Sequence, residues 1–93
     1  MTAFAALNKK LFALRLAELR ERAGYSQADV VRRSGERFSQ ANYSQWERGT
    51  STPNVTYLPA IADALGVGVW ELFEDPTEGF KPTPSKYSPK KKD

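Results

Sequence analysis

Residues 39–49 of this 93-residue chain read SQANYSQWERG, a stretch with the markings of a short helix that has two different faces. Ser39 is a typical N-cap residue, and glycine, here Gly49, is the residue that most often follows a helix. At about 100° per residue, the small and polar side chains gather on one side and the bulky ones on the other: Gln40, Ala41, Ser44, Gln45 and Arg48 against Tyr43, Trp46 and Glu47. We therefore expect a helix at residues 40–48 that buries its aromatic rings and presents a polar face.

The same start and stop signals divide the rest of the chain into further short helices. They predict helices at residues 2–23, 27–33, 57–65 and 69–74, separated by Gly24, Gly35, Pro53 and Gly66. No stretch shows the apolar/polar alternation of a strand. We therefore expect an all-α fold, a compact bundle of about five short helices followed by a flexible C-terminal tail.

The predicted first helix carries two apolar stripes. One consists of Phe12, Leu16, Leu19 and Ala23, and we expect it to serve the core of the domain. The other consists of Phe4, Leu7, Leu11 and Leu14. It is covered either by the C-terminal helices, as part of one broad buried face, or by a partner chain.

The composition changes after Glu74. Residues 75–93, DPTEGFKPTPSKYSPKKKD, hold four of the six prolines, and five lysines against three acidic residues, so they carry +2 of the net charge of +3. Such a stretch buries too little apolar surface to order itself. We expect one domain at residues 1–74 and a disordered Pro/Lys-rich tail at 75–93, whose terminal lysines either attract phosphates or only keep the chain soluble.

Composition also excludes several classes of function. The chain has no cysteine and no histidine, which removes Cys/His zinc sites and imidazole-based catalysis. Paired-carboxylate and glycine-rich phosphate motifs are also missing from the sequence. We expect no enzyme activity, no metal and no cofactor. No apolar run approaches the length of a membrane span, and the start does not resemble a secretory signal, so we expect a cytoplasmic location and no membrane partner.

The polar face of residues 40–48 has the chemistry needed to read double-stranded DNA. Glutamine pairs with the N6/N7 edge of adenine, a small apolar side chain contacts the thymine methyl, and arginine binds guanine or phosphate. An ordinary solvated helix shows the same amphipathic pattern, so this argument depends on the surrounding sequence.

That surrounding sequence resembles the lambdoid phage repressor/Cro family of helix-turn-helix proteins, the XRE-like family, over residues 16–73. The matching stretches are LAELRERAGYSQADV, FSQANYSQWERG and LPAIADALGV. Within them stand the residues that are usual at these places in the family: Arg20, Ser26-Gln27, Phe38-Ser39 and Glu47-Arg48-Gly49. The resemblance implies a helix-turn-helix whose second helix, at residues 40–48, enters the major groove.

The resemblance also implies roles for individual residues. Bases are read by Gln40, Ala41 and Gln45, and we add Ser44 from its place on the same face. Phosphates are bound by the start of the second helix and by the stretches that flank the third: Ser26, Gln27, Ser39, Arg48, Thr50 and Ser51. Arg20 and Glu47 form a structural pair between the first and third helices.

The chain departs from the family at the turn between the second and third helices. The turn at residues 35–39 is about two residues longer than usual, and Val31 stands where alanine is usual. Three arginines surround this turn, Arg32, Arg33 and Arg37, and we expect only Arg37 to reach the phosphates.

The sequence thus predicts a dimeric repressor on a near-palindromic operator, with half-sites about 34 Å apart. The candidate dimer surfaces are the last helix, with Trp70, and the stripe of Phe4, Leu7, Leu11 and Leu14. The alternative is an antitoxin-like module that binds a protein partner, a toxin or an antirepressor, and also regulates its own operon.

Overall fold

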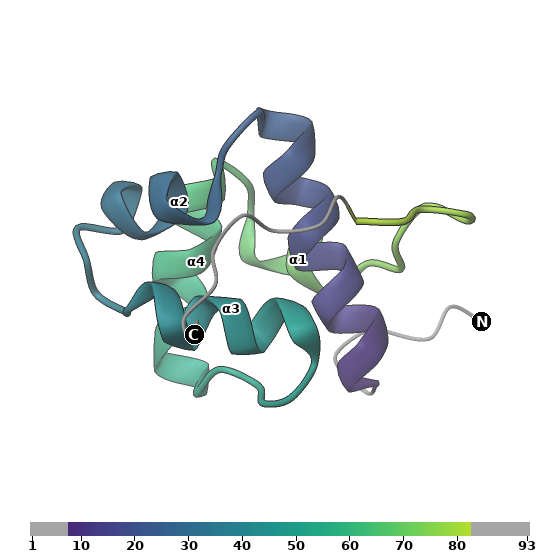
Figure 1. Ribbon diagram of the computed structural model, residues 1–93, viewed down its shortest axis with the longest axis horizontal. Helices are drawn as coiled ribbons and strands as arrows, with labels where there is room; N and C mark the ends of the chain where they lie inside the picture. The colour runs from purple at the N-terminus through teal and green to yellow at the C-terminus, as the bar shows by residue number, and fades with distance from the viewer. Residues whose placement is uncertain (1–7, 83–93) are drawn as a thin grey trace, which may run out of the picture.

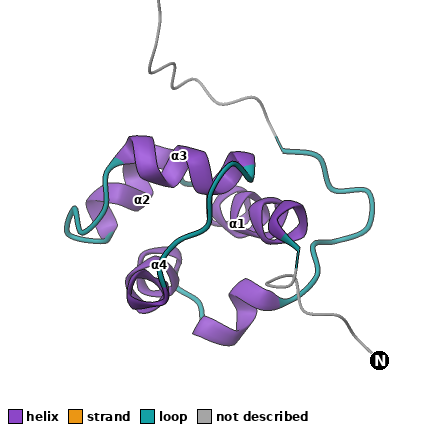
Figure 2. Ribbon diagram, turned by 90° about the horizontal axis from the view of Figure 1, so that it is seen from below, coloured by secondary structure: helices purple, strands orange, loops and turns teal. Residues whose placement is uncertain are grey.

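The structure is a computed structural model that describes residues 8–82, and these residues are helical with no strand among them. In chain order the elements are the α-helices and 3-10 helices α1 Lys9–Ala23, α2 Gln27–Arg33, α3 Gln40–Arg48, η2 Val55–Tyr57, α4 Leu58–Leu65 and η3 Val69–Phe73. The expected all-α bundle is confirmed (Figure 1). Figure 2 shows α4 end-on while α3 lies across the view, so the helices cross steeply and do not run in parallel.

The second and third helices begin and end where the sequence predicts. Ser26 caps α2, because its hydroxyl accepts a hydrogen bond from the Asp29 amide at 3.0 Å. Ser39 caps α3 in the same way, at 3.0 Å from the Asn42 amide. Gly49 ends α3 in the left-handed conformation, with a φ of 76°, which glycine adopts without the strain of a Cβ.

The first helix begins later than expected. Asn8 is extended, with a φ of −141°, and its side-chain oxygen accepts the amides of Lys10 and Leu11 at 2.9 and 3.2 Å. A side chain that satisfies these free amides starts a helix at the next residue, so the prediction of one continuous helix from residue 2 is wrong. Phe4 and Leu7 lie outside the described residues.

The core confirms most of the first apolar stripe. Phe12, Leu16 and Leu19 are buried together with residues of every other helix, among them Val30, Tyr43, Ile61 and Leu72. Ala23 is exposed in the last turn of α1, so its assignment to the core is wrong. Leu11 and Leu14 of the second stripe are half-buried, and Leu11 packs against the core of its own chain.

The start of the predicted tail is bound to α1. Glu18 is 4% exposed, and its carboxylate accepts the Thr77 amide at 3.1 Å. Buried Arg15 bonds the carbonyl of Glu71 at 2.8 Å and the carboxylate of Glu74 at 2.8 Å. The prediction of a flexible segment from residue 75 onward is therefore wrong up to residue 82, because a buried carboxylate satisfies backbone that cannot form a helix. The terminal lysines lie outside the described residues.

A search of the described residues finds no helix with the length and apolar character needed to cross a membrane.

Candidate nucleic-acid interface

The helix α3 divides its residues between the core and the surface as expected. Tyr43 is fully buried and Trp46 is 4% exposed, whereas Ala41 and Gln45 are exposed and Gln40 is half-exposed. The two aromatic rings thus hold the helix to the domain and leave its glutamines accessible.

An aromatic cluster fixes this orientation. Trp46 lies edge-on to Phe38, with the ring centroids 5.2 Å apart, and 5.6 Å from the ring of Tyr57. Phe38 also stacks on Tyr43 at 5.8 Å. Such ring pairs contribute about 0.5–1.5 kcal/mol each beyond their burial. The residues that lead into α3 and follow it are therefore packed against the same side of the helix.

Ser44 lies on the buried side of α3 and not on its outward face. The residue is 2% exposed, and its hydroxyl accepts a hydrogen bond from Nη1 of Arg48 at 2.7 Å. The prediction that Ser44 reads bases is wrong for this arrangement, because α1 packs against α3 and widens the buried arc. Asn42 is exposed instead, a residue that the wheel placed outside the polar face.

The loop after α3 folds back toward Gln45. The Thr50 hydroxyl donates to the Gln45 carbonyl oxygen at 3.2 Å, and the Ser51 hydroxyl lies 3.4 Å from the side-chain oxygen of Gln45. Arg48 is exposed beside this loop. The structure therefore brings together Gln45, Arg48, Thr50 and Ser51, which the sequence assigned to base reading and to phosphate binding.

A buried ionic network joins the three helices behind the outward face. Arg20 in α1 donates to both carboxylate oxygens of Glu47 in α3, through Nε at 2.6 Å and Nη2 at 3.0 Å. Burial lowers the pKa of Arg20, but the hydrogen bonds and charge of Glu47 outweigh it and the pKa is raised. The expected Arg20–Glu47 pair is thus confirmed.

Gln27 belongs to this network and does not face solvent. Its side chain is buried, and Nε2 donates to a carboxylate oxygen of Glu47 at 3.0 Å. The expectation that the Gln27 side chain holds a phosphate is wrong for this arrangement, because its amide group already serves Glu47. The side-chain oxygen of Gln27 and the hydroxyl of Tyr43 are both buried without a hydrogen-bond partner.

The start of α2 is also poorly suited to an anion. Ser26 is exposed, but its hydroxyl and amide are both engaged with Asp29. The hydrogen bond from the Ser26 backbone lowers the pKa of Asp29, so this carboxylate is ionised at neutral pH. Its negative charge occupies the end of the helix that would otherwise attract a phosphate.

Among the arginines around the long turn, the structure favours Arg37. Arg32 forms an ion pair with Asp29. Arg33 donates to the carbonyl oxygen of Ala64 at 2.6 Å and lies over the ring of Tyr25. Arg37 is exposed, one residue before buried Phe38 and two before exposed Ser39, and its side chain is not drawn into the fold.

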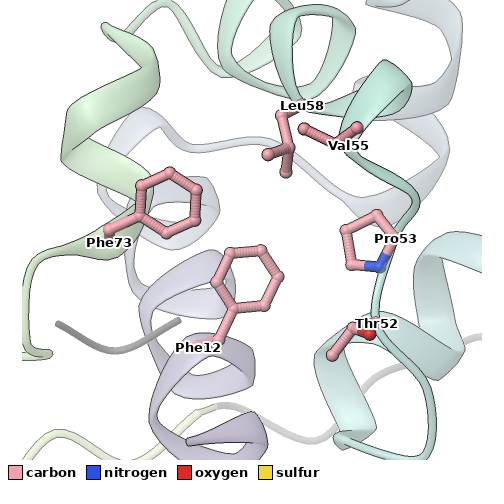
Figure 3. Close-up of a pocket in the computed structure, with 6 residues that line it drawn as sticks. All are labelled: Phe12, Thr52, Pro53, Val55, Leu58 and Phe73. Atoms are coloured by element: carbon pink, nitrogen blue, oxygen red, sulfur yellow. The ribbon is translucent and has the colours of Figure 1, made fainter. Parts of the chain in front are cut away.

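An apolar surface lies away from the α3 face. A recess of about 290 Å³ is lined by Phe12, Thr52, Pro53, Val55, Leu58 and Phe73 (Figure 3). Val55 is 71% exposed and Trp70 is 68% exposed. Trp70 shares a side of η3 with Phe73, since residues three apart eclipse in a 3-10 helix. We call Val55, Trp70, Phe73 and this recess the apolar face.

Two short helices, one bracing the other so that its polar side is presented outward, define a helix-turn-helix domain of the DNA-binding class. The comparisons agree: residues 11–72 match a family described as "Helix-turn-helix domain". The chain belongs to this family, in its XRE-like form, and its relatives are regulators of transcription and not enzymes.

Individual relatives point the same way. The chain is 44% identical over 64 residues to the uncharacterised HTH-type transcriptional regulator y4dJ of Sinorhizobium fredii (strain NBRC 101917 / NGR234), covering 69% of this chain and 80% of that protein. It is similar to the restriction-modification controller protein C.AhdI from Aeromonas hydrophila, with a TM-score of 0.66 and 30% identity over 72% of this chain and 98% of that one. A hypothetical transcription factor NHTF from Neisseria matches with a TM-score of 0.66 and 26% identity, over 75% and 78% of the two chains.

Proposed function

We propose that this protein is a sequence-specific repressor that binds a near-palindromic operator as a homodimer, with α3 of each subunit in the major groove. The observation that carries the proposal is the division of α3. Gln45 and Ala41 face solvent while Tyr43 and Trp46 are held in the core. Because the buried Arg20–Glu47 pair also fixes the helix, the glutamines are presented on a rigid surface.

Each exposed group on α3 has a partner in the groove. Gln40 and Gln45 suit adenine, and Ala41 suits the methyl group of thymine. Arg48, Thr50 and Ser51 lie at the C-terminal end of the helix, and Arg37 and Ser39 at its N-terminal end, where the two phosphate strands border a groove. The exposed amide of Asn42 extends the same surface.

The apolar face is the surface proposed for dimerisation. One reading helix covers only a few base pairs, so two subunits are needed to hold half-sites about one helical turn apart. Trp70 protrudes from a face that also contains a recess, and such a face buries both features when it meets a copy of itself around a two-fold axis. A dimer that occupies an operator represses by excluding polymerase from the same DNA.

Selection of duplexes from a random pool tests this function. The expected result is a pair of inverted half-sites with centres one helical turn apart, or a multiple of it. Sedimentation of the complex should give two chains on each duplex. Enrichment of no sequence would contradict the proposal.

The antitoxin-like alternative places a different protein on the same apolar face, since an exposed Trp70 and Val55 suit either kind of partner. It predicts a monomer in isolation. Co-purification of a second protein encoded beside this one, together with loss of the homodimer, would favour the alternative.

A further inference from the structure

A basic edge continues the outward face of α3 beyond its C-terminal end. It consists of Lys9 and Lys10, in the first turn of α1, together with Arg48 in the last turn of α3. All three residues are exposed. Among residues 8–82 the side chains of the two lysines make no ion pair or hydrogen bond, so their charges face solvent.

The close packing of α1 on α3 places the lysines at this position. Gly49 rests on the first turn of α1: a Cβ on it would lie 3.7 Å from the carbonyl oxygen of Lys9 and 3.9 Å from Cα of Lys10. Figure 1 shows the start of α1 beside the end of α3. The loop that follows Gly49 then returns to Gln45 through Thr50 and Ser51. The lysines therefore flank the loop proposed to contact the DNA backbone.

The stability of α1 does not explain these two lysines. The N-terminal end of a helix is its positive end, where acidic side chains stabilise and lysines do not. The first turn of α1 holds no acidic residue, and Asn8 already caps it. Residues that break a local rule without a structural gain are expected at functional surfaces.

We propose that Lys9 and Lys10 bind backbone phosphates of the same duplex that α3 reads, beyond the phosphates contacted by Arg48, Thr50 and Ser51. The inference rests on the proposed function and extends its footprint outward along one strand. A lysine that neutralises a phosphate releases condensed counterions, so its contribution depends on salt and not on base sequence.

The test is the double variant Lys9→Gln/Lys10→Gln on duplexes of roughly 30 base pairs, long enough for two half-sites. One duplex carries a selected sequence and the other a scrambled one. The variant should bind both more weakly, and the slope of log K against log salt should fall in magnitude by about 1.8, or 0.9 for each lost contact. The control Lys81→Gln removes an exposed lysine from the segment after η3 and should leave the slope unchanged.

The charge-preserving variant Lys9→Arg/Lys10→Arg should keep the wild-type slope, and both double variants should keep the wild-type melting temperature. A wild-type slope in the glutamine variant, or an equal loss in Lys81→Gln, would overturn this inference and leave the role of α3 intact. A wild-type protein that binds neither duplex would overturn the proposed function as well.

Discussion

Glu47 in α3 holds Arg20 in α1 by two hydrogen bonds, one from Nε at 2.6 Å and one from Nη2 at 3.0 Å. Both side chains are buried, at 6% and 9% exposed. Because Glu47 lies on the inner side of α3, this pair and the aromatic cluster set the rotation of the helix about its own axis. That rotation decides which side chains face a duplex.

Breaking this pair should cost more stability than any exposed substitution. The change Glu47→Gln leaves the Arg20 charge buried with its counter-charge removed, and we expect the free energy of unfolding to fall by roughly 3–5 kcal/mol. Urea unfolding followed by circular dichroism measures it. Glu36→Gln, at an exposed position, should change stability little. A Glu47→Gln protein as stable as the wild type would show that the pair does not hold α3.

Gln27 should act on stability and not on DNA. Its buried amide donates to Glu47 at 3.0 Å, so Gln27→Ala should lower the free energy of unfolding by roughly 1–3 kcal/mol. At temperatures well below unfolding, the affinity for selected and scrambled duplexes should be unchanged. If the folded variant bound both duplexes more weakly, Gln27 would contact phosphate after all.

Trp70 should be needed for the dimer and not for the fold. Its ring is 68% exposed, so Trp70→Ser should give a folded monomer with the helical spectrum of the wild type. Trp70→Phe keeps an aromatic surface and should remain dimeric. Sedimentation velocity distinguishes the two states. Leu11 is a poor choice for this experiment, because it packs against the core of its own chain and its loss would unfold the monomer.

The stability of the domain should fall in acid through Glu18. Burial raises the pKa of Glu18, but hydrogen bonds from Thr77 and Arg15 outweigh it and the pKa is lowered. A carboxyl with a lowered pKa in the folded state stabilises the fold above its ordinary pKa of about 4.3, and this contribution is lost as the pH falls through the folded value.

The matched variant for that experiment is Glu18→Gln, which has no charge to lose. Its urea unfolding should depend less on pH below about 5 than that of the wild type. Equal pH dependence in the two proteins would show that the contact between Glu18 and the Thr77 amide does not stabilise the fold.

Local signals predicted the elements of the site, and packing decided what the sequence could not. Ser39 and Gly49 act on the residues beside them, so both ends of α3 could be predicted from sequence. The burial of Ser44 depends on how closely α1 approaches α3, which a helical wheel does not contain. The exposure of Asn42 has the same origin.

Charged residues hid the other large departure. Arg15 and Glu18 suggest a solvated helix surface, yet both are 4% exposed because residues 74–77 cover them. Nothing in a proline-rich stretch indicates that its backbone donates to a buried carboxylate. Asn8 could have been recognised, since asparagine is a strong N-cap, but the apolar pattern of residues 4–14 suggested one longer helix.

The outward orientation of Gln45 is tested most directly by comparing wild-type protein and Gln45→Ala on duplexes that differ from the selected site by single base pairs. The account predicts that Gln45→Ala loses roughly 1–3 kcal/mol on the selected site and stops discriminating at one position of each half-site, while Ser44→Ala discriminates as the wild type does. Unchanged discrimination by Gln45→Ala, or lost discrimination in Ser44→Ala alone, would contradict it.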